Sequence, residues 1–416
     1  LPFVFYEYCC NNIITFRHLS INKKYTFHFK YFPFLLILYQ YHIYPDYHQL
    51  NYIFFLSVQC LLPVHQLSGI VAFSLFFDYF FAISISTMAV IAFSGATHDI
   101  ACDGVYMAEL NKEEQAKYIG VQGAFYNVAK LVANGGLVAM AGALAEYFGA
   151  IEGASLEANK GAYSYAWMII FAVIAAIMVL IGLYHIRMLP SNQIPSTTKK
   201  TTSEVGRELV AVIANFFTKK HIFYYICFII LYRLAEGFIM KIAPLFLRAS
   251  REVGGLGLSL KEIGTLNGVF GSAAFVLGSL LAGIYVSKFG LKRTLFTLCC
   301  IFNLPFLAYT FLAVTQPTNV YLIGTCITME YFGYGFGFVG LTLFMMQQIA
   351  PGKHQMSHYA FASGIMNLGV MLPGMVSGYF SDLLGYRNFF IYVLIATIPA
   401  FLITYFIPFT YDDSKK

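Results

Sequence analysis

The sequence predicts an all-α protein that crosses a membrane many times, and three observations lead to this class. Apolar residues make up 59% of the 416 residues. Charged residues make up only 11%, whereas an ordinary soluble domain carries about 25%. Apolar runs of about 20 residues, each long enough for a bilayer-spanning helix, recur between Leu67 and Pro408. A membrane β-barrel would instead show short segments of alternating hydrophobicity.

The apolar runs predict nine spanning helices with mostly short connections, which suit antiparallel neighbours. We expect them at residues 79–107, 118–147, 165–188, 222–248, 261–288, 291–314, 321–349, 357–384 and 388–409. Residues 112–117 are expected to form a charged turn and residues 149–163 an exposed loop. Residues 50–76 are apolar enough to supply one further span, broken between Pro63 and Gln66.

Composition divides the chain into unequal parts. All 34 glycines lie at or beyond Gly69, and the first alanine is Ala72. Because small residues let membrane helices pack closely, residues 1–68 are either a divergent start or sequence foreign to the fold, and their composition favours the second interpretation. The remaining parts are the remnant of a first helical half (69–189), a polar linker (190–220), a second half of six helices (221–410) and a polar tail (411–416).

Basic residues in the connections predict the orientation. Six basic and only two acidic side chains lie between Arg187 and Lys220. The turn at residues 288–293 and the end of the chain at Lys415 and Lys416 are also basic. Because Lys and Arg accumulate in cytoplasmic loops, we expect the linker and the C-terminus in the cytoplasm and the protein in the inner (plasma) membrane. The net charge of +6 is explained in the same way.

The sequence lacks the motifs expected for metal binding, enzymatic catalysis or nucleic-acid binding. The eight cysteines show no paired spacing, and no zinc-type or CxxC pattern occurs, so we expect neither a metal nor a cofactor. Neither an HExxH motif nor a nucleophile elbow occurs, which argues against a membrane enzyme. Because no basic cluster is interleaved with aromatic residues, we expect no nucleic-acid partner.

His98, Asp99 and Asp103 interrupt the apolar segment that begins at Tyr79. A charge near the bilayer centre costs about 2.5–3.5 kcal/mol on insertion scales, so such residues are rare unless they face a cavity or a partner. Asp99 and Asp103 are four residues apart, which places both carboxylates on one helical face. These residues predict a polar face around which the other helices are arranged.

Arg233, Glu236 and Lys241 lie inside the fourth expected span. Arg233 and Glu236 are three residues apart and can pair along a helix. Such a pair either satisfies only itself or lines a cavity in which it binds substrate or relays protons. Because an apolar residue would be the simpler stable solution inside a membrane, the sequence favours the second interpretation.

Two further segments supply polar groups. Glu330 opens the stretch EYFGYGFGF, in which Tyr334 adds a polar tip and the glycines suit close helix packing. Glu330 lies near a helix end, where a solvated position is the alternative to a functional one. Tyr126 and Lys130 continue a polar stripe of four-residue period. Lys130 either holds an anionic group or neutralises Asp99 or Asp103, and the sequence leaves this open.

These segments, quoted as they stand, resemble one family. They are SGATHDIACDGVYMAEL, YRLAEGFIMKIAPLFL followed by REVGGLGLSLKEIG, EYFGYGFGF and GIMNLGVMLPGMVSGYFSDLLGYRNFF. With two halves joined by a basic linker and the basic turn VSKFGLKRT, they resemble the major facilitator superfamily, and more specifically its muropeptide-permease (AmpG-like) branch. EYFGYGFGF is also similar to acetyl-CoA transporter relatives. The resemblance covers roughly residues 79–410.

The resemblance implies a twelve-helix transporter that works by alternating access and is driven by protons. The family's first two helices have no counterpart here, so we expect its helical bundle with these helices missing or replaced. In the family, helices one, four, seven and ten line the cavity, and Asp103, Glu236 and Glu330 map to three of them. The predicted solute and proton pathway comprises His98, Asp99, Asp103, Tyr126, Lys130, Arg233, Glu236, Lys241, Glu330 and Tyr334.

The leading hypothesis is proton-coupled import of a bulky polar solute, such as a muropeptide or another sugar or peptide conjugate. The first alternative is transport of acetyl-CoA or another organic anion, for which Lys130, Arg233 and Lys241 would converge on phosphates. The second alternative is a truncated membrane protein that does not transport. The expected partners are the solute, protons and membrane lipid, and we expect a monomer.

Overall fold

The computed structural model describes residues 80–151, 158–188 and 202–411. Every regular element in these ranges is a helix. Five helical segments among the described residues are long and apolar enough to cross a membrane: Lys160–Tyr184, Ile222–Arg248, Gly264–Phe289, Leu291–Thr315 and Gln355–Tyr405. The expectations for residues 1–68 and for the end of the polar tail lie outside the described residues. The chain divides into two compact units, of which the second comprises Leu110–Asn127 and everything from Val210 onward.

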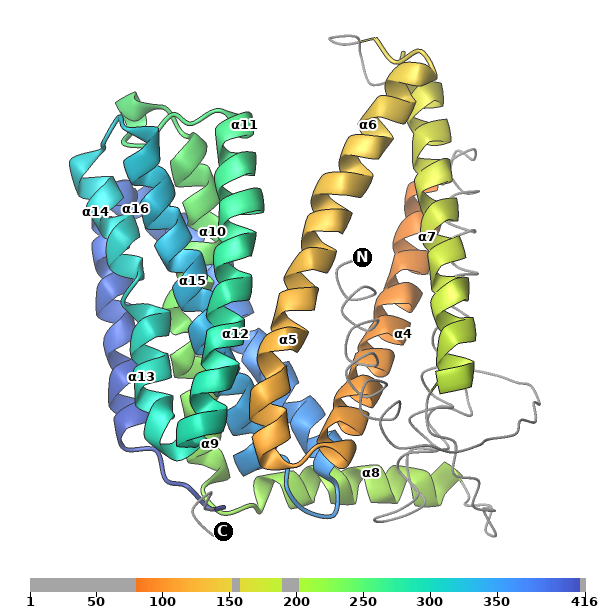
Figure 1. Ribbon diagram of the computed structural model, residues 1–416, viewed down its shortest axis with the longest axis vertical. Helices are drawn as coiled ribbons and strands as arrows, with labels where there is room; N and C mark the ends of the chain where they lie inside the picture. Colours follow the sequence, from red (N-terminus) through yellow and green to blue (C-terminus); the bar gives the residue numbers. More distant parts are fainter. Residues whose placement is uncertain (1–79, 152–157, 189–201, 412–416) are drawn as a thin grey trace. The chain divides into compact units, whose positions relative to one another are not determined.

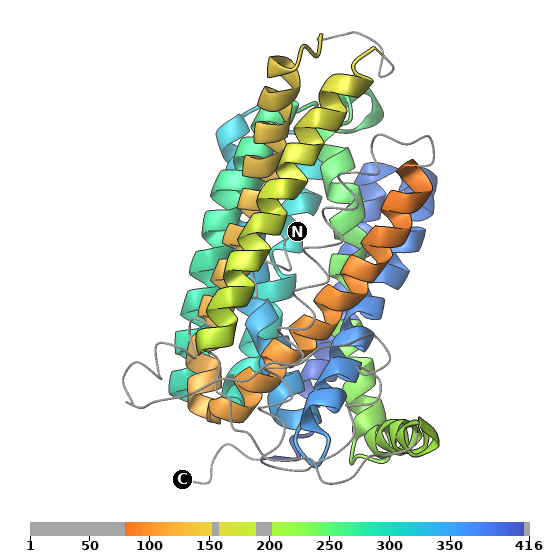
Figure 2. The same ribbon diagram turned by 90° about the vertical axis from the view of Figure 1, so that its right-hand side faces the viewer.

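The first unit contains α4 (Phe80–Glu109), the end of α5 (Lys112–Leu131), the π-helix η1 (Val132–Leu137), α6 (Val138–Tyr147) and α7 (Lys160–Met188). The helices α6 and α7 lie side by side (Figure 2). Their shared core contains Leu137, Ala141, Ile170 and Ile174. The expected spans at 79–107, 118–147 and 165–188 are therefore helical, and η1 inserts one wider turn into the second of them.

The expected charged turn at residues 112–117 is wrong, because these residues open α5. The backbone N–H of Glu114 donates to Asn111 Oδ1 at 3.0 Å, and the backbone N–H of Asn111 donates to Glu114 Oε2 at 3.1 Å. This reciprocal pair is a capping box, which satisfies two N–H groups at the start of a helix. Glu113 and Glu114 in the first turn also favour the positive end of the helix dipole.

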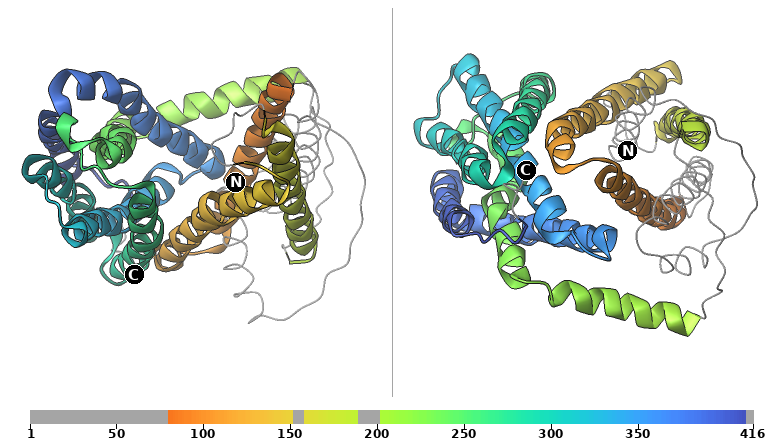
Figure 3. Two further views of the ribbon diagram at one scale, coloured as in Figure 1. Left: turned by 90° about the horizontal axis from the view of Figure 1, so that it is seen from above. Right: turned by 60° about the horizontal axis from the view of Figure 1, so that its bottom comes forward.

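The second unit provides the six helical segments expected in the later half (Figure 1). They are α9–α10 (Ile222–Tyr232 and Leu234–Arg248), α11–η3–α12 (Leu260–Ile263, Gly264–Gly271, Ser272–Phe289), α13–α14 (Leu291–Asn303, Phe306–Thr315), α15–η4 (Val320–Phe344, Met345–Ile349) and the two parts of α16 (Gln355–Tyr405). A non-helical backbone at Gly385, with φ 69° and ψ 160°, separates the two parts of α16. Seen end-on, the helices α9–α16 form one bundle (Figure 3).

Glycines let α15 lie at the centre of close contacts. It packs against α12 and α13, while α16 packs against α9 and α10. A side chain at Gly333 would collide with the carbonyl oxygen of Ile301 and with Pro305, and one at Gly335 would collide with the backbone of Phe275. The expectation that these glycines serve close helix packing is therefore confirmed.

The polar linker contains a helix that the composition did not reveal, α8 (Thr202–Phe217). Val212 and Phe216 on this helix are buried. The Phe216 ring contacts Phe361 at a centroid distance of 5.5 Å, and His358 Nε2 lies 3.3 Å from the carbonyl oxygen of Val212. Because α8 buries an apolar face against α16, the described part of the linker from Thr202 onward packs against the second unit.

Lys219 holds the start of α9 to the end of η4. Its Nζ donates to the carbonyl oxygens of Ile349, Ala350 and Pro351, the latter two at 3.2 and 2.9 Å. These carbonyls follow a helix end, where intrahelical donors are lacking. A cationic side chain at this position therefore replaces the missing N–H groups and favours the negative end of the helix dipole.

Lys219→Met is expected to lower the stability of the second unit by about 1.5–3 kcal/mol, the range for hydrogen bonds that involve a charged group. Burial lowers the pKa of Lys219 to about 8, so most side chains carry the ammonium at pH 7. Thermal unfolding of the purified protein at pH 7 measures the effect. Lys220→Met is the matched control, because Lys220 is exposed, and equal unfolding temperatures in both variants would contradict the assignment.

Candidate functional site

The predicted pathway residues are divided between the two units. His98, Asp99, Asp103 and Lys130 belong to the first unit, and the other six belong to the second.

On α4, polar side chains lie inside an otherwise apolar helix. His98 is 1% exposed and Asp103 is 5% exposed, while Asp99 is half-buried. The His98 Nδ1 atom lies 3.4 Å from Cys102 Sγ, one turn further along the helix. All three ionisable side chains have interaction partners. Lys130 lies in α5, and its side chain is outside the described part of the structure, so both interpretations of its role remain open.

The centre of the second group is an ion pair at a break in a membrane-spanning segment. The backbone leaves helical geometry at Arg233, with φ −104° and ψ 6°, and this residue separates α9 from α10. Arg233 Nε donates to Glu236 Oε2 and a terminal guanidinium nitrogen donates to Oε1, both at 2.6 Å. Both residues are only 5% exposed. The pair is therefore bidentate and almost completely shielded from solvent.

Aromatic side chains surround this pair. The Arg233 guanidinium carbon lies 5.2 Å from the centre of the Phe338 ring, within the range of a cation–π interaction. The Tyr334 ring contacts those of Phe338, Phe302 and Phe275, with centroid distances between 5.1 and 5.9 Å. Tyr334 also interacts electrostatically with Arg233, Glu236, Glu330 and Tyr126. The structure thus brings five of the predicted residues, from α5, α10, α15 and the α9–α10 junction, into one electrostatic cluster.

Glu330 occupies a distinct place in this cluster. It is half-buried on α15 and interacts electrostatically with Glu236 and Tyr309. Within the described ranges no hydrogen bond or ion pair holds its carboxylate. Intramembrane carboxylates occur in the proton relays of pumps and transporters.

In the described part of the structure no hydrogen bond or ion pair joins Lys241 to the cluster. Its side chain is exposed on α10, and its Cγ lies close to Gly374 of α16. Arg233 is already bound by Glu236. Of the three cations expected to converge on phosphates, one is therefore paired and one is exposed, and the side chain of the third lies outside the described structure.

Two residues near these elements were not predicted. Phe338 belongs to the quoted stretch EYFGYGFGF, but its contact with Arg233 depends on the packing of separate helices. Asn267 lies in the π-helix η3, where its buried Oδ1 has no hydrogen-bond partner among the described residues. π-Helical turns inside α-helices often occur at functional sites. The sequence could have indicated Asn267, because it is an asparagine within the apolar run of residues 261–288.

A helical bundle that holds an ion pair inside a segment able to cross a membrane is an arrangement found in membrane transport proteins. A sequence profile of the Major Facilitator Superfamily matches residues 61–354, so the chain belongs to this superfamily. It is similar in fold to the outward conformation of FucP, a transporter of this superfamily, with a TM-score of 0.59, 11% identity and coverage of 97% of this chain and 96% of that one. For a second structure, the fucose:proton symporter FucP from E. coli, the TM-score is 0.52 at 12% identity, with coverage of 98% and 96%.

Relatives by sequence point to one branch. The anhydromuropeptide permease of Escherichia coli is 23% identical over 209 residues, which cover 50% of this chain. This match spans only 41% of that permease. Putative transporter AmpG 1 of Rickettsia bellii is 24% identical over 357 residues, or 86% of this chain and 80% of the relative. The chain is therefore similar to AmpG-type relatives within the superfamily, and its membership of a transporter superfamily indicates a transporter and not an enzyme, in agreement with the prediction.

Proposed function

We propose that the protein imports a bulky polar solute together with protons, and that the solute is a muropeptide or a similar sugar and peptide conjugate. Two observations support this. The matched relatives include a permease named for anhydromuropeptides, and the cluster around Arg233 presents charges of both signs and several aromatic faces. Peptide-bearing sugars carry carboxylates, amides and apolar ring faces, which suit such a surface.

The proposal of proton coupling rests on the electrostatic interaction of Glu330 with Glu236 of the ion pair. Glu236 is held in a bidentate ion pair, whereas Glu330 lacks a fixed partner in the described structure. When Glu330 is ionised, its charge repels the carboxylate of Glu236. Protonation removes this repulsion, so the proton on Glu330 and the arrangement of the ion pair are linked. We infer that Glu330 carries the proton and that Arg233 and Glu236 respond to the solute.

An organic-anion carrier of the acetyl-CoA type is less well supported. It would need cationic side chains that meet at one place, and in the second unit Arg233 is neutralised by Glu236 while Lys241 is exposed. The proposed setting is the inner membrane, with a cytoplasmic C-terminus and a monomeric protein. The basic linker and the basic turn between α12 and α13 support this orientation.

Glu330→Gln is expected to reduce proton-driven accumulation of solute at least tenfold and to leave solute exchange at equal pH nearly unchanged. The amide keeps the shape of the side chain but cannot carry a proton. The measurement is uptake of a labelled anhydromuropeptide by proteoliposomes, with and without an imposed pH gradient.

Glu252→Gln is the matched control, because Glu252 is an exposed carboxylate on the 3₁₀ turn η2 (Arg251–Val253). Full accumulation by Glu330→Gln would remove Glu330 from the proton pathway. Asp103→Asn and Glu236→Gln extend the test, and unchanged gradient-driven uptake in both would contradict the site assignment. Absence of uptake by the parent protein would favour a chain that does not transport.

A further inference from the structure

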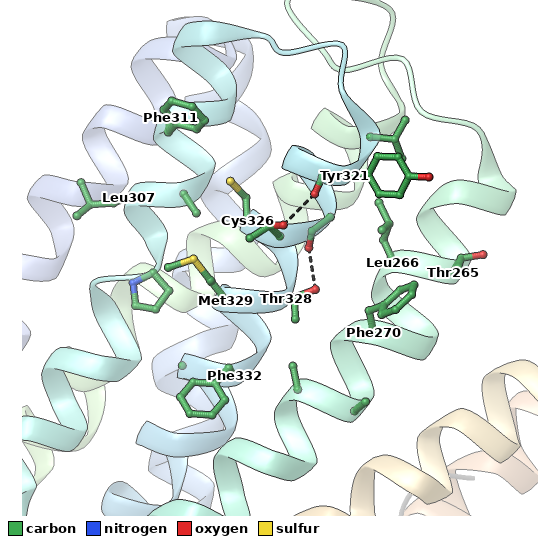
Figure 4. A pocket seen from close by; sticks show the side chains of 18 of the residues that line it. Thr265, Leu266, Phe270, Leu307, Phe311, Tyr321, Cys326, Thr328, Met329 and Phe332 are labelled. Atoms are coloured by element: carbon green, nitrogen blue, oxygen red, sulfur yellow. Dashed lines mark hydrogen bonds between the residues drawn. The ribbon is translucent and has the colours of Figure 1, made fainter.

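An apolar groove lies on the second unit, and none of the residues that line it belongs to the charged cluster around Arg233. Its floor is α15, and its walls are α12 on one side and the end of α13 with α14 on the other (Figure 4). Its volume is about 1690 Å³, larger than the roughly 300–1,000 Å³ of ordinary small-molecule pockets. The groove therefore has room for an occupant larger than an ordinary small molecule.

The groove results from where the helices approach and where they part. At its closed end, Gly278 of α12 lies against the carbonyl oxygen of Phe332, and Gly333 lies against Pro305. Leu304 and Pro305 interrupt the helix between α13 and α14, although both keep right-handed helical backbone angles, and a proline at this place kinks the segment. Small residues, Ala273 and Ala274 on α12 and Ala308 on α14, line the walls beyond this point and leave the space open.

The lining offers almost no free hydrogen-bonding groups in the described structure. The hydroxyl of Thr325 donates to the carbonyl oxygen of Tyr321 at 2.9 Å, and that of Thr328 donates to the carbonyl oxygen of Gly324 at 2.7 Å (Figure 4). The rest of the wall is built mostly from Leu, Phe, Met and Ala side chains. A hydrocarbon chain loses no hydrogen bonds when it binds to such a surface, whereas a polar solute would lose its hydrogen bonds to water.

The side chains at the edges of the groove are exposed. Phe270, Leu277, Leu307 and Met329 line the groove and are each more than half exposed. The first three of them lie on segments that are long and apolar enough to cross a membrane. In a bilayer we therefore expect lipid chains to reach these edges of the groove.

One end of the groove is polar and carries a negative charge. Ser259, Glu262 and Tyr321 lie there, next to the loops before α11 and α15. The backbone N–H and the hydroxyl of Ser259 donate to Glu262 Oε2 at 2.8 and 2.7 Å. These bonds lower the pKa of Glu262, so its carboxylate is ionised at neutral pH. Among the described side chains that line the groove, Glu262 alone is charged, which favours a cationic head group.

We propose that this groove binds one phospholipid, with its hydrocarbon chains along α12, α14 and α15 and its primary ammonium, as in phosphatidylethanolamine, against Glu262. The lipid fills the space that the parted helices leave and becomes part of the second unit. Its chains cover the exposed aromatic edges, and its head group neutralises the carboxylate at the polar end.

Native mass spectrometry of the full chain, purified in mild detergent and supplied with equal amounts of phosphatidylethanolamine and phosphatidylglycerol, tests the proposal. The parent is expected to retain one phosphatidylethanolamine. Ala308→Trp, which fills the groove, is expected to lower its occupancy at least fivefold. Ile398→Trp adds the same ring to a half-exposed position of α16 outside the groove and is expected to behave like the parent. Size-exclusion chromatography confirms that both variants remain folded.

Glu262→Gln tests the contact with the lipid head group separately from the contacts with the hydrocarbon chains. It is expected to keep one bound lipid but to bind the two phospholipids equally. Undiminished lipid retention by Ala308→Trp would overturn the groove as the binding site. An equal mixture of both lipids on the parent would overturn the role of Glu262. A dimer that dissociates in Ala308→Trp would overturn the proposal in favour of a second copy as the occupant.

Discussion

Arg233→Met is expected to destabilise the second unit by about 3–5 kcal/mol, the cost of leaving one partner of a buried ion pair without its counter-charge. Glu236 would keep its carboxylate at 5% exposure and lose both 2.6 Å hydrogen bonds. The cation–π contact with Phe338 would disappear as well. The unfolding temperature in detergent, followed by the fraction of monodisperse protein after heating, measures this loss.

The double variant Arg233→Met/Glu236→Leu is expected to recover most of the stability, because apolar side chains of similar volume replace a buried ion pair at little or no cost. Its uptake activity should remain abolished. Arg248→Met, at the exposed end of the same helix, is the control and should shift the unfolding temperature very little. If the single variant unfolds at the temperature of the parent, the pair does not stabilise the second unit. If the double variant transports normally, the pair is not needed for transport.

Gly337→Ala is expected to destabilise the protein by about 1–3 kcal/mol, as overpacking of a well-packed core does. A Cβ atom at this position would collide with Phe302 and would lie 2.7 Å from the carbonyl oxygen of Leu298. Neither neighbour is the flexible end of a side chain, so α13 and α15 would have to separate. Thermal unfolding of the purified variant measures the effect.

Gly378→Ala makes the same substitution at a position where it should not destabilise the protein. A Cβ atom at Gly378 of α16 has no neighbour within 4 Å. Alanine favours a helix over glycine by about 1 kcal/mol, so this variant should be as stable as the parent or slightly more stable. Equal destabilisation by both substitutions would show that close packing of α15 is not the reason for its glycines.

Much of the fold follows from the sequence because the bilayer sets the length of each apolar run. The expected spans of the second half agree with α9–α10 and with the later helices to within a few residues. The spacing of Arg233 and Glu236 predicted their pairing, since neighbours on one helix do not depend on tertiary structure. Close packing at Gly333 and Gly335 was predictable for another reason, because small residues in a membrane helix let a neighbouring helix approach closely.

The missed features depend on tertiary contacts or on capping. Lys112 opens a helix because Asn111 and Glu114 cap it, although the segment is rich in charge. The helix α8 forms in a polar linker because Phe216 finds a partner in Phe361. The contact of Lys241 with Gly374 could not be derived from the sequence, because it depends on which face of α10 meets α16.

The break at Arg233 also determines the backbone electrostatics of the second unit. There the carboxyl end of α9 meets the amino end of α10 in the middle of a segment that spans the bilayer. Helix ends carry about half an elementary charge, negative at the carboxyl end and positive at the amino end. Arg233 and Glu236 stand at the ends that favour their own charges. A solute that bears both an amine and a carboxylate would therefore meet, at one depth, dipole ends of both signs.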